Sequence, residues 1–223
     1  MIFNFEDKSE RLGTNNAVAK KPFPISVKKE KKFKSKRNWL KKITIFDSKS
    51  WKVLSIRLKQ KIIILKNKTN LGFSKALNIG LKKSSGKYIC ILNPDTLFEQ
   101  KTMQNMFNYM EKSFDVACLS PKIVNLDGSL QISCKRSLPS IKNSFFKITR
   151  IDKLFPSNSF FSSYNLLFLD EDKVNEVEVI SGACMFMRKD VLDIVGYFDE
   201  SFFMYGEDID YCHRINAVSY THL

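Results

Sequence analysis

The sequence predicts an α/β fold in which helices flank a mostly parallel sheet. The first observation is a series of short apolar runs, typical of strands, at Ile43–Phe46, Ile62–Leu65 and Tyr88–Leu92. The second is that segments with helical character separate these runs, at about Trp51–Gln60 and Phe73–Lys83. Strands that alternate with helices are joined by crossover connections, which place the strands side by side and parallel.

The stretch 70–95, which reads NLGFSKALNIGLKKSSGKYICILNPD, contains the clearest candidate for a ligand site. Its strand ends at Pro94, because proline has no N–H to donate to a neighbouring strand. Asp95 is therefore expected at the carboxyl end of a buried strand, where ligands bind in open α/β sheets. Beside the polar Asn93, this carboxylate could hold a divalent cation against a phosphate. The alternative is an ordinary turn whose aspartate only caps the next helix.

The other expected elements continue the alternation. The helix after Asp95 carries a stripe of methionines, interpreted as core because apolar residues at helical spacing usually face inward. In chain order, the expected elements are a first strand within residues 1–5, a helix start at Glu6–Leu12, a helix at Glu99–Ser113, a strand at Asp115–Leu119, a hairpin at Val124–Ser133 that turns at Asp127-Gly128, an apolar strand at Cys184–Met187 after Val177–Ile180, a short helix from Arg188 to Val195, and a last helix that opens at Glu207-Asp208.

Two long segments lack clear periodicity. The segment 13–42 is rich in lysine and contains prolines, and it is interpreted as a mobile loop with some helix near Ser35–Lys41. The segment 137–173 is aromatic, and loops of this length are usually functional or mobile. It is expected to form the wall or lid of an acceptor pocket.

The length and the cysteines narrow the class of protein. A chain of 223 residues suffices for one large α/β domain, or for a domain with appendages. The five cysteines are far apart and form no CxxC pair, so a disulfide framework or zinc site is not expected. No apolar run approaches the ~20 residues that span a bilayer, and the start does not resemble a signal peptide. A cytoplasmic protein is expected.

The net charge of +14 raises the question of an anionic partner. Eleven lysines and arginines fall within 20–42 against the single acid Glu30. This segment allows a nucleic-acid-binding or anionic-membrane-binding module as an alternative function. Nucleic acid is disfavoured, because the only aromatic residues within the lysine run are Phe23, Phe33 and Trp39.

Five carboxylates crowd into residues 199–210, among many aromatic residues. Partial desolvation and mutual repulsion raise the pKa of a carboxylate and make it a better base. The alternative is structural, since Glu207 and Asp208 suit a helix N-terminus through the helix dipole. An ATPase is disfavoured because the chain has no GxxxxGK[ST] loop, and a dinucleotide-dependent dehydrogenase because it has no GxGxxG motif. The chain also has no HxxxH pattern, which would indicate a zinc site.

Four segments in series resemble the family 2 glycosyltransferases, most closely the rhamnosyltransferase-like branch. They read NLGFSKALNIG, GKYICILNPDT, DGSLQISCKRSLPS and ISGACMFMRKDVLDIVGYFDESFFMYGEDIDYCHRI, and the strong match covers Ile62–Ile215. The resemblance implies a GT-A fold, with a nucleotide-sugar-binding half at 43–120 and an acceptor-binding, catalytic half at 121–215. A basic segment at 1–42 then precedes these halves and a non-family tail at 216–223 follows them.

The resemblance also implies an activity. The expected reaction is inverting transfer of a sugar from a nucleotide-diphosphate donor, dTDP-rhamnose or a UDP-sugar, assisted by Mg²⁺ or Mn²⁺. The expected acceptor is a cell-surface glycan or a polyprenyl-linked molecule, in polysaccharide biosynthesis at the inner face of the cell membrane, with peripheral contact to it. A non-catalytic remnant of the same fold is a further alternative.

Carried over residue by residue, the resemblance assigns a role to each candidate site residue. It assigns donor binding to Asp47, Asn70, Lys75, Asn78, Asp95, Gly182 and Ala183, acceptor binding to Asp199 and Glu200, the metal to Asp95, and catalysis to the base Asp208 with its neighbour Glu207. The chemistry agrees, because a sugar hydroxyl is a poor nucleophile that needs a base to accept its proton. The diphosphate leaving group gathers negative charge, which a cation stabilises.

The sequence departs from the family pattern at four places. Asn93 stands where the metal motif has its first acid, and Ser48 stands where an asparagine usually follows Asp47. The basic segment at 1–42 replaces the first helix. After Ile215 the tail matches nothing in the family, so an incomplete chain is expected and His222 is not expected to be a metal ligand.

Overall fold

The computed structural model describes residues 2–5, 26–29, 42–45, 61–98, 100–125, 127–218 and 221–222. Asp47 lies outside the described residues, as do the helices expected at Glu6–Leu12, Ser35–Lys41 and Trp51–Gln60.

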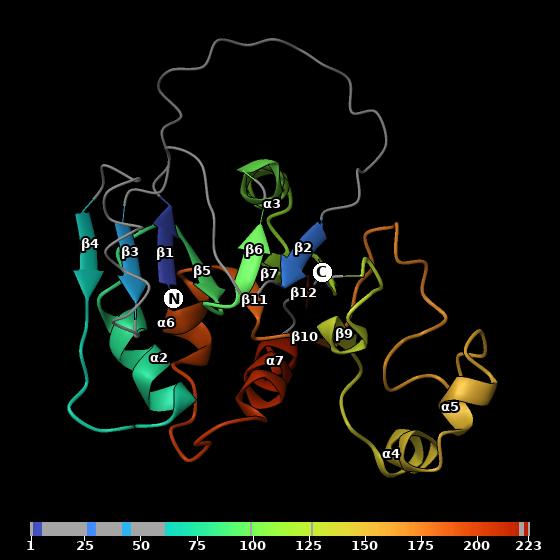
Figure 1. Cartoon of the computed structure of the whole chain (residues 1–223). Helices are drawn as coiled ribbons and strands as arrows, with labels where there is room; N and C mark the ends of the chain where they lie inside the picture. The colour runs from blue at the N-terminus through green and yellow to red at the C-terminus, as the bar shows by residue number, and fades with distance from the viewer. Residues whose placement is uncertain are drawn as a thin grey trace, which may run out of the picture.

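A central sheet organises the described part of the chain (Figure 1). In spatial order its strands are β12 (Thr221–His222), β7 (Val116–Leu119), β11 (Cys184–Arg188), β5 (Tyr88–Leu92), β1 (Ile2–Phe5), β3 (Lys42–Ile45) and β4 (Lys61–Ile64). Most of these strands coincide, within a residue or two, with the expected apolar runs. Thr221–His222 comes from the tail at 216–223 and pairs with β7.

The sheet is mixed in its strand directions. Strands β3 and β4 pair parallel, and so do β7 and β12. Strand β1 is antiparallel to both β3 and β5, and β11 is antiparallel to both β5 and β7. Strands β3, β4, β5, β7 and β12 therefore share one direction, as predicted, but β1 and β11 run against it and lie between them, so most neighbouring strands of the described sheet pair antiparallel. Because β11 lies between β5 and β7, the two predicted halves contribute strands to one sheet.

Helices cover both faces of the sheet (Figure 1). Along the buried strand β5, Tyr88, Cys90 and Leu92 join one apolar cluster, while Ile89 and Ile91 join another, because successive side chains point to opposite faces. The first cluster contains the predicted methionine stripe of α3 (Gln100–Lys112), which is confirmed as core. The second contains residues of α2 (Phe73–Lys82), α6 (Val191–Val195) and α7 (Glu207–Ala217). Within the described part of the chain, no helix is both long and apolar enough to cross a membrane.

Two small sheets lie beside the central one. One has the order β6 (Thr96–Phe98), β2 (Ser26–Lys29), β8 (Lys122–Val124), and the other pairs β9 (Lys135–Arg136) with β10 (Val179–Ile180). The prediction of a loop was wrong at Ser26–Lys29. This segment extends between β6 and β8 and completes a sheet with them. Its partners are distant in the sequence, so nothing local indicated the strand.

The segment 137–173 is not a plain loop, because it contains α4 (Ile141–Ile148) and α5 (Ile151–Leu154). A capping box begins α4: the Ser140 hydroxyl accepts from the Asn143 backbone N–H, and the Asn143 side chain accepts from the Ser140 backbone N–H. The third helical residue of a capping box is usually glutamate or glutamine. Here it is Asn143, so the sequence alone did not reveal the capping box.

Three other expectations need correction in detail. The hairpin reverses at Asp127-Gly128 as predicted, but its second arm is a single bridge at Leu130 followed by a 3-10 turn (Ile132–Cys134). Strand β4 lies at the edge of the sheet, so Ile64 is half-exposed instead of covered on both faces. Arg188 does not open a helix but ends β11, where its buried guanidinium donates to the backbone carbonyls of Val116 in β7 and Met110 in α3.

Candidate active site

The turn that follows β5 lies against the segment that precedes β11. The backbone N–H of Asn93 donates to the carbonyl of Ala183 over 2.9 Å. The Thr96 hydroxyl donates back to the carbonyl of Asn93 at 2.6 Å, which closes the turn around Pro94. Asp95 is exposed in this turn. The structure therefore brings the turn that carries Asp95 against Ala183, through Asn93.

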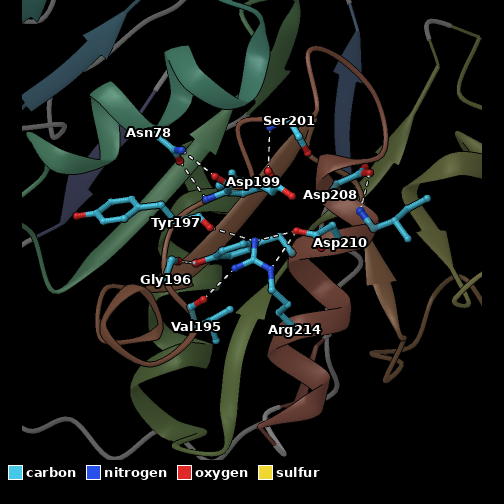
Figure 2. A network of polar contacts seen from close by, with 12 residues as sticks. Asn78, Val195, Gly196, Tyr197, Asp199, Ser201, Asp208, Asp210 and Arg214 are labelled. Atoms are coloured by element: carbon cyan, nitrogen blue, oxygen red, sulfur yellow. Dashed lines mark hydrogen bonds and ion pairs between the residues drawn. The ribbon is translucent and has the colours of Figure 1, made fainter.

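The same segment contacts the first turn of α7. The backbone N–H of Gly182 lies 3.3 Å from Asp208 Oδ2, and that oxygen also receives Arg136 Nη2 at 2.5 Å. The other carboxylate oxygen of Asp208 accepts from the backbone N–H of Ile209 at 2.9 Å. The Asp208 and Arg136 side chains are mostly buried. Donors from three segments of the chain thus fix the predicted base in one orientation, and Figure 2 shows it at the start of α7.

Glu207, the first residue of α7, is in a different environment from its neighbour. Its side chain is buried, and its Oε2 atom has no hydrogen-bond partner among the residues that the structure describes. Burial raises the pKa of this carboxyl above its ordinary value, and the charge of Asp208 adds to the shift. The expectation that desolvation and crowding raise a carboxylate pKa in this cluster is met at Glu207.

Asp199 behaves in the opposite way. It is exposed, and hydrogen bonds from the backbone N–H and hydroxyl of Ser201 lower its pKa. Figure 2 shows this contact at the turn that precedes α7. Asp199 is therefore ionised at neutral pH and accessible, which suits a residue that contacts a polar ligand.

The predicted donor motif at 70–73 is joined to the loop that leads into α7. Gly72 has φ +80°, and the Asn70 side chain accepts from its backbone N–H at 3.1 Å. The next residue, Phe73, donates its N–H to the Phe203 carbonyl at 2.6 Å. A Cβ atom on Gly72 would lie 2.6 Å from that same carbonyl oxygen. Only glycine allows this approach, so Asn70 and Gly72 hold the loop at Phe203 in place.

Asn78 links the predicted donor and acceptor residues. Its buried amide nitrogen donates to the Phe198 carbonyl at 2.8 Å and to Glu200 Oε1 at 3.1 Å, while its oxygen accepts from the Phe198 N–H at 3.0 Å (Figure 2). Lys75, one turn earlier on α2, lies 4.0 Å from Glu200. Asn78 therefore anchors the turn at 198–200, and its contact with a donor stays a prediction.

Arg214 ties together the loop before the acidic cluster. It forms two hydrogen bonds to Asp210 Oδ2 and donates to the carbonyls of Val195 and Tyr197 (Figure 2). Tyr211 also contributes, because its hydroxyl donates to the Gly196 carbonyl. Asp210 is thus engaged in holding this loop through Arg214.

Sequence reasoning missed Arg136 and Arg214 as parts of this arrangement. Arg214 follows Asp210 by four residues, a spacing that brings the two side chains together on one helix face. Arg136 lies in the segment DGSLQISCKRSLPS that carried part of the resemblance, but nothing local links it to Asp208, 72 positions away.

The described residues offer one exposed carboxylate, not a metal cage, at the end of β5. Among them, no group of three or more His, Cys, Asp or Glu side chains gathers to hold a metal ion. Mg²⁺ is commonly held by one or two carboxylates together with substrate phosphates and waters. Asp95 beside Asn93 fits a cation that arrives with a diphosphate, and it does not fit a dedicated structural site.

A cavity of about 130 Å³ opens beside the site, under the end of the segment 137–173. Its wall includes Tyr109, Leu130, Cys134 and Lys135, and residues 171–175 close one side. Its edge reaches Ile180, two residues before Gly182. The end of the long segment therefore lines a pocket, but no predicted site residue lines it, and a role of this segment in acceptor binding stays a prediction.

Comparison with known proteins identifies relatives of one kind. The family model for glycosyl transferase family 2 matches residues 47–196. The low-salt glycan biosynthesis hexosyltransferase Agl10 of Haloferax volcanii is 26% identical over 149 residues, which cover 65% of this chain and 43% of that protein. An N-acetylglucosaminyl-diphospho-decaprenol L-rhamnosyltransferase of Mycobacterium tuberculosis is 23% identical over 168 residues, 70% of this chain and 54% of that protein. The chain spans about half the length of these curated relatives.

Proposed function

Because the chain belongs to glycosyl transferase family 2, whose model matches more than half of it, we propose that it transfers a sugar from a nucleotide-diphosphate donor to an acceptor hydroxyl with inversion. The fold is the GT-A fold of that family. One observation carries the proposal: the Gly182 N–H contacts Asp208 while the next residue, Ala183, accepts from Asn93. The strand-end turn, the small-residue segment and the acidic helix thus meet in one place.

The donor side of the proposal rests on the turn after β5. Asp95, with Asn93 beside it, would hold Mg²⁺ or Mn²⁺ against the donor diphosphate. When bound, such a cation stabilises the negative charge that gathers on the leaving group. Lys75 is half-exposed, and its 4.0 Å ion pair with Glu200 is long, so it can turn toward a phosphate at little cost.

The acceptor side rests on Asp208. The acceptor oxygen forms a bond to the anomeric carbon while the bond from that carbon to the phosphate oxygen breaks. Asp208 accepts the hydroxyl proton, and the nucleoside diphosphate leaves with the electron pair. A single displacement inverts the anomeric centre and needs no covalent nucleophile. Arg136 and the Gly182 N–H keep the carboxylate aimed at the site.

The relatives favour a glycan or lipid-linked acceptor. The Mycobacterium relative is named as a rhamnosyltransferase for a diphospho-decaprenol substrate, and the Haloferax relative as a hexosyltransferase of glycan biosynthesis. We therefore propose dTDP-rhamnose or a UDP-sugar as the donor class, and a cell-surface glycan or polyprenyl-linked acceptor that contacts Asp199 and Glu200. The protein would act at the inner face of a membrane.

Calorimetric binding of UDP and dTDP, each with Mn²⁺, tests the donor site. Micromolar binding that needs the metal and is lost in Asp95→Ala supports the proposal, and the preferred base narrows the donor. Asp115→Ala is the matched control, because Asp115 is also an exposed aspartate in a turn, the one between α3 and β7, but lies outside the site. If the folded protein binds neither nucleotide, the chain is a non-catalytic member of its family.

A further inference from the structure

Helix α4 turns an apolar side outward. Ile141, Phe145 and Ile148 recur at the spacing of one helix face, yet their exposed fractions are 94%, 56% and 81%. The opposite side faces the protein, because Asn143 is buried and donates to Ser137 Oγ and the Leu138 carbonyl. An amphipathic helix normally buries its apolar side, so this orientation requires a reason.

The exposed apolar side continues beyond α4. Leu154, Phe155 and Phe160 are exposed by 73%, 52% and 53%. Phe146 supports this surface from beneath, with ring centroids 5.4 Å from Phe160 and 5.1 Å from Phe161. We call the six exposed residues the α4–α5 face: Ile141, Phe145, Ile148, Leu154, Phe155 and Phe160. Contiguous apolar surface of this kind on a protein usually marks an interaction site.

Positive charge borders the α4–α5 face. On the helical wheel of α4, Lys142 and Lys147 fall on either side of the apolar stripe. Arg150 and Lys153 follow, both exposed. Asp152 is the only acidic residue within 141–160, and it is buried with its carboxylate 3.5 Å from Lys147 Nζ. Lys147 is thus paired with a buried acid, whereas Lys142, Arg150 and Lys153 are exposed and have no further acid within this stretch to compensate them.

We propose that the α4–α5 face docks on the surface of a lipid bilayer that contains anionic lipids. Aromatic and aliphatic side chains enter the region between headgroups and acyl chains, while flanking lysines and arginines extend to the phosphates. Each cation near an anionic surface adds to the attraction, and the three exposed cations around this face, Lys142, Arg150 and Lys153, share one sign. A purely apolar protein partner would give these cations no counterion, whereas the headgroups of anionic lipids supply one beside an apolar layer.

This location differs from the basic segment at 20–42, which had suggested membrane contact from its charge alone. In Figure 1, α4 and α5 lie apart from the central sheet, and no other labelled helix covers them. The docking is independent of the proposed catalysis, so either can fail alone. If both hold, it brings the site close to a lipid-linked acceptor.

Vesicle flotation tests the proposal on the full chain. The probes are vesicles of phosphatidylcholine alone and of equal parts phosphatidylcholine and phosphatidylglycerol. The test variant combines Ile141→Ser, Phe145→Ser and Ile148→Ser, which are exposed and should not affect folding. The matched control combines Phe114→Ser, Ile194→Ser and Val218→Ser, three exposed apolar residues elsewhere. Thermal unfolding checks that both variants fold.

We expect the unmodified protein to partition onto the anionic vesicles, the test variant to lose at least about tenfold of that partitioning, and the control to retain it. A charge variant, Lys142→Glu with Arg150→Glu and Lys153→Glu, should lose the preference for anionic vesicles. The proposal is overturned if the unmodified protein binds neither vesicle, or if the test variant binds as well as the control. It is equally overturned if the serine changes only dissociate a dimer in light scattering, since the face would then join two copies.

Discussion

Arg136 Nη2 lies 2.5 Å from Asp208 Oδ2, so the short strand β9 is joined to the first turn of α7. The pair is mostly buried, and Gly182 shares the same oxygen. A carboxylate in this setting is held in one orientation, which suits a group that must accept a proton from a bound hydroxyl. Arg136 is therefore a positioning residue for the proposed base.

Replacing Arg136 should impair turnover more than substrate binding. In Arg136→Met we expect kcat to fall roughly 100-fold while KM for the donor changes little, because the lost contact orients the base and not the donor. Arg136→Lys keeps the charge but not the planar fork, and it should recover part of the loss. Steady-state kinetics measure both. A purely structural role would instead lower the folded fraction and leave kcat per folded molecule unchanged.

Gly72→Ala should destabilise the protein by about 3 kcal/mol or displace the loop at Phe203. The new Cβ meets a backbone oxygen at 2.6 Å, and the φ of +80° is unfavourable for alanine. Urea unfolding measures the change in the free energy of unfolding.

Gly128→Ala is the matched control for this prediction. Its φ is +87°, but nothing lies within 4 Å of the added atom, so only the backbone strain of about 1 kcal/mol applies. If both variants lose the same free energy of unfolding, the close approach of Gly72 to Phe203 does not contribute to the effect of Gly72→Ala.

Arg188→Met should lower the free energy of unfolding by about 3 kcal/mol or more. The guanidinium donates to the carbonyls of Val116, Met110 and Ser113, two of which lie at the C-terminal end of α3. Removal leaves these acceptors buried without a donor. Lys189→Met, at the next position and outside the core, should change the free energy of unfolding little, and thermal unfolding of both variants compares them.

The stability difference between the protein and Glu207→Gln should depend on pH. Burial raises the folded-state pKa of Glu207, so the folded protein resists its ionisation and loses stability as pH rises through that raised pKa. The glutamine variant has no such loss and should gain stability over the unmodified protein at pH 7. The stability difference between the two proteins should disappear below the ordinary pKa of glutamate, about 4.3, because Glu207 is then protonated in both the folded and the unfolded state. Urea unfolding at several pH values checks this, and a gap independent of pH would contradict it.

Elements with a strong local pattern could be predicted from the sequence. Tyr88–Leu92 is an apolar run that stops shortly before Pro94, and the methionines of α3 repeat at helical spacing. The burial of both elements could therefore be predicted. Residues whose partners are distant could not be found in this way. Ser26–Lys29 extends only because β6 and β8 flank it, and Arg136 gains its role from a carboxylate 72 positions later. In α4 the helical period was present, but its apolar side faces outward and its cap uses asparagine.

The position of β11 in the centre of the sheet also affects how the chain reaches its fold. Strands β5 and β7 are close in the sequence, yet both pair with β11, which the ribosome makes much later. Until then, both strands have open apolar edges that invite pairing with other chains. Contacts between such distant segments also slow folding. A nascent chain that stops before Cys184 should therefore aggregate, and the centre of this sheet should depend on chaperones during synthesis.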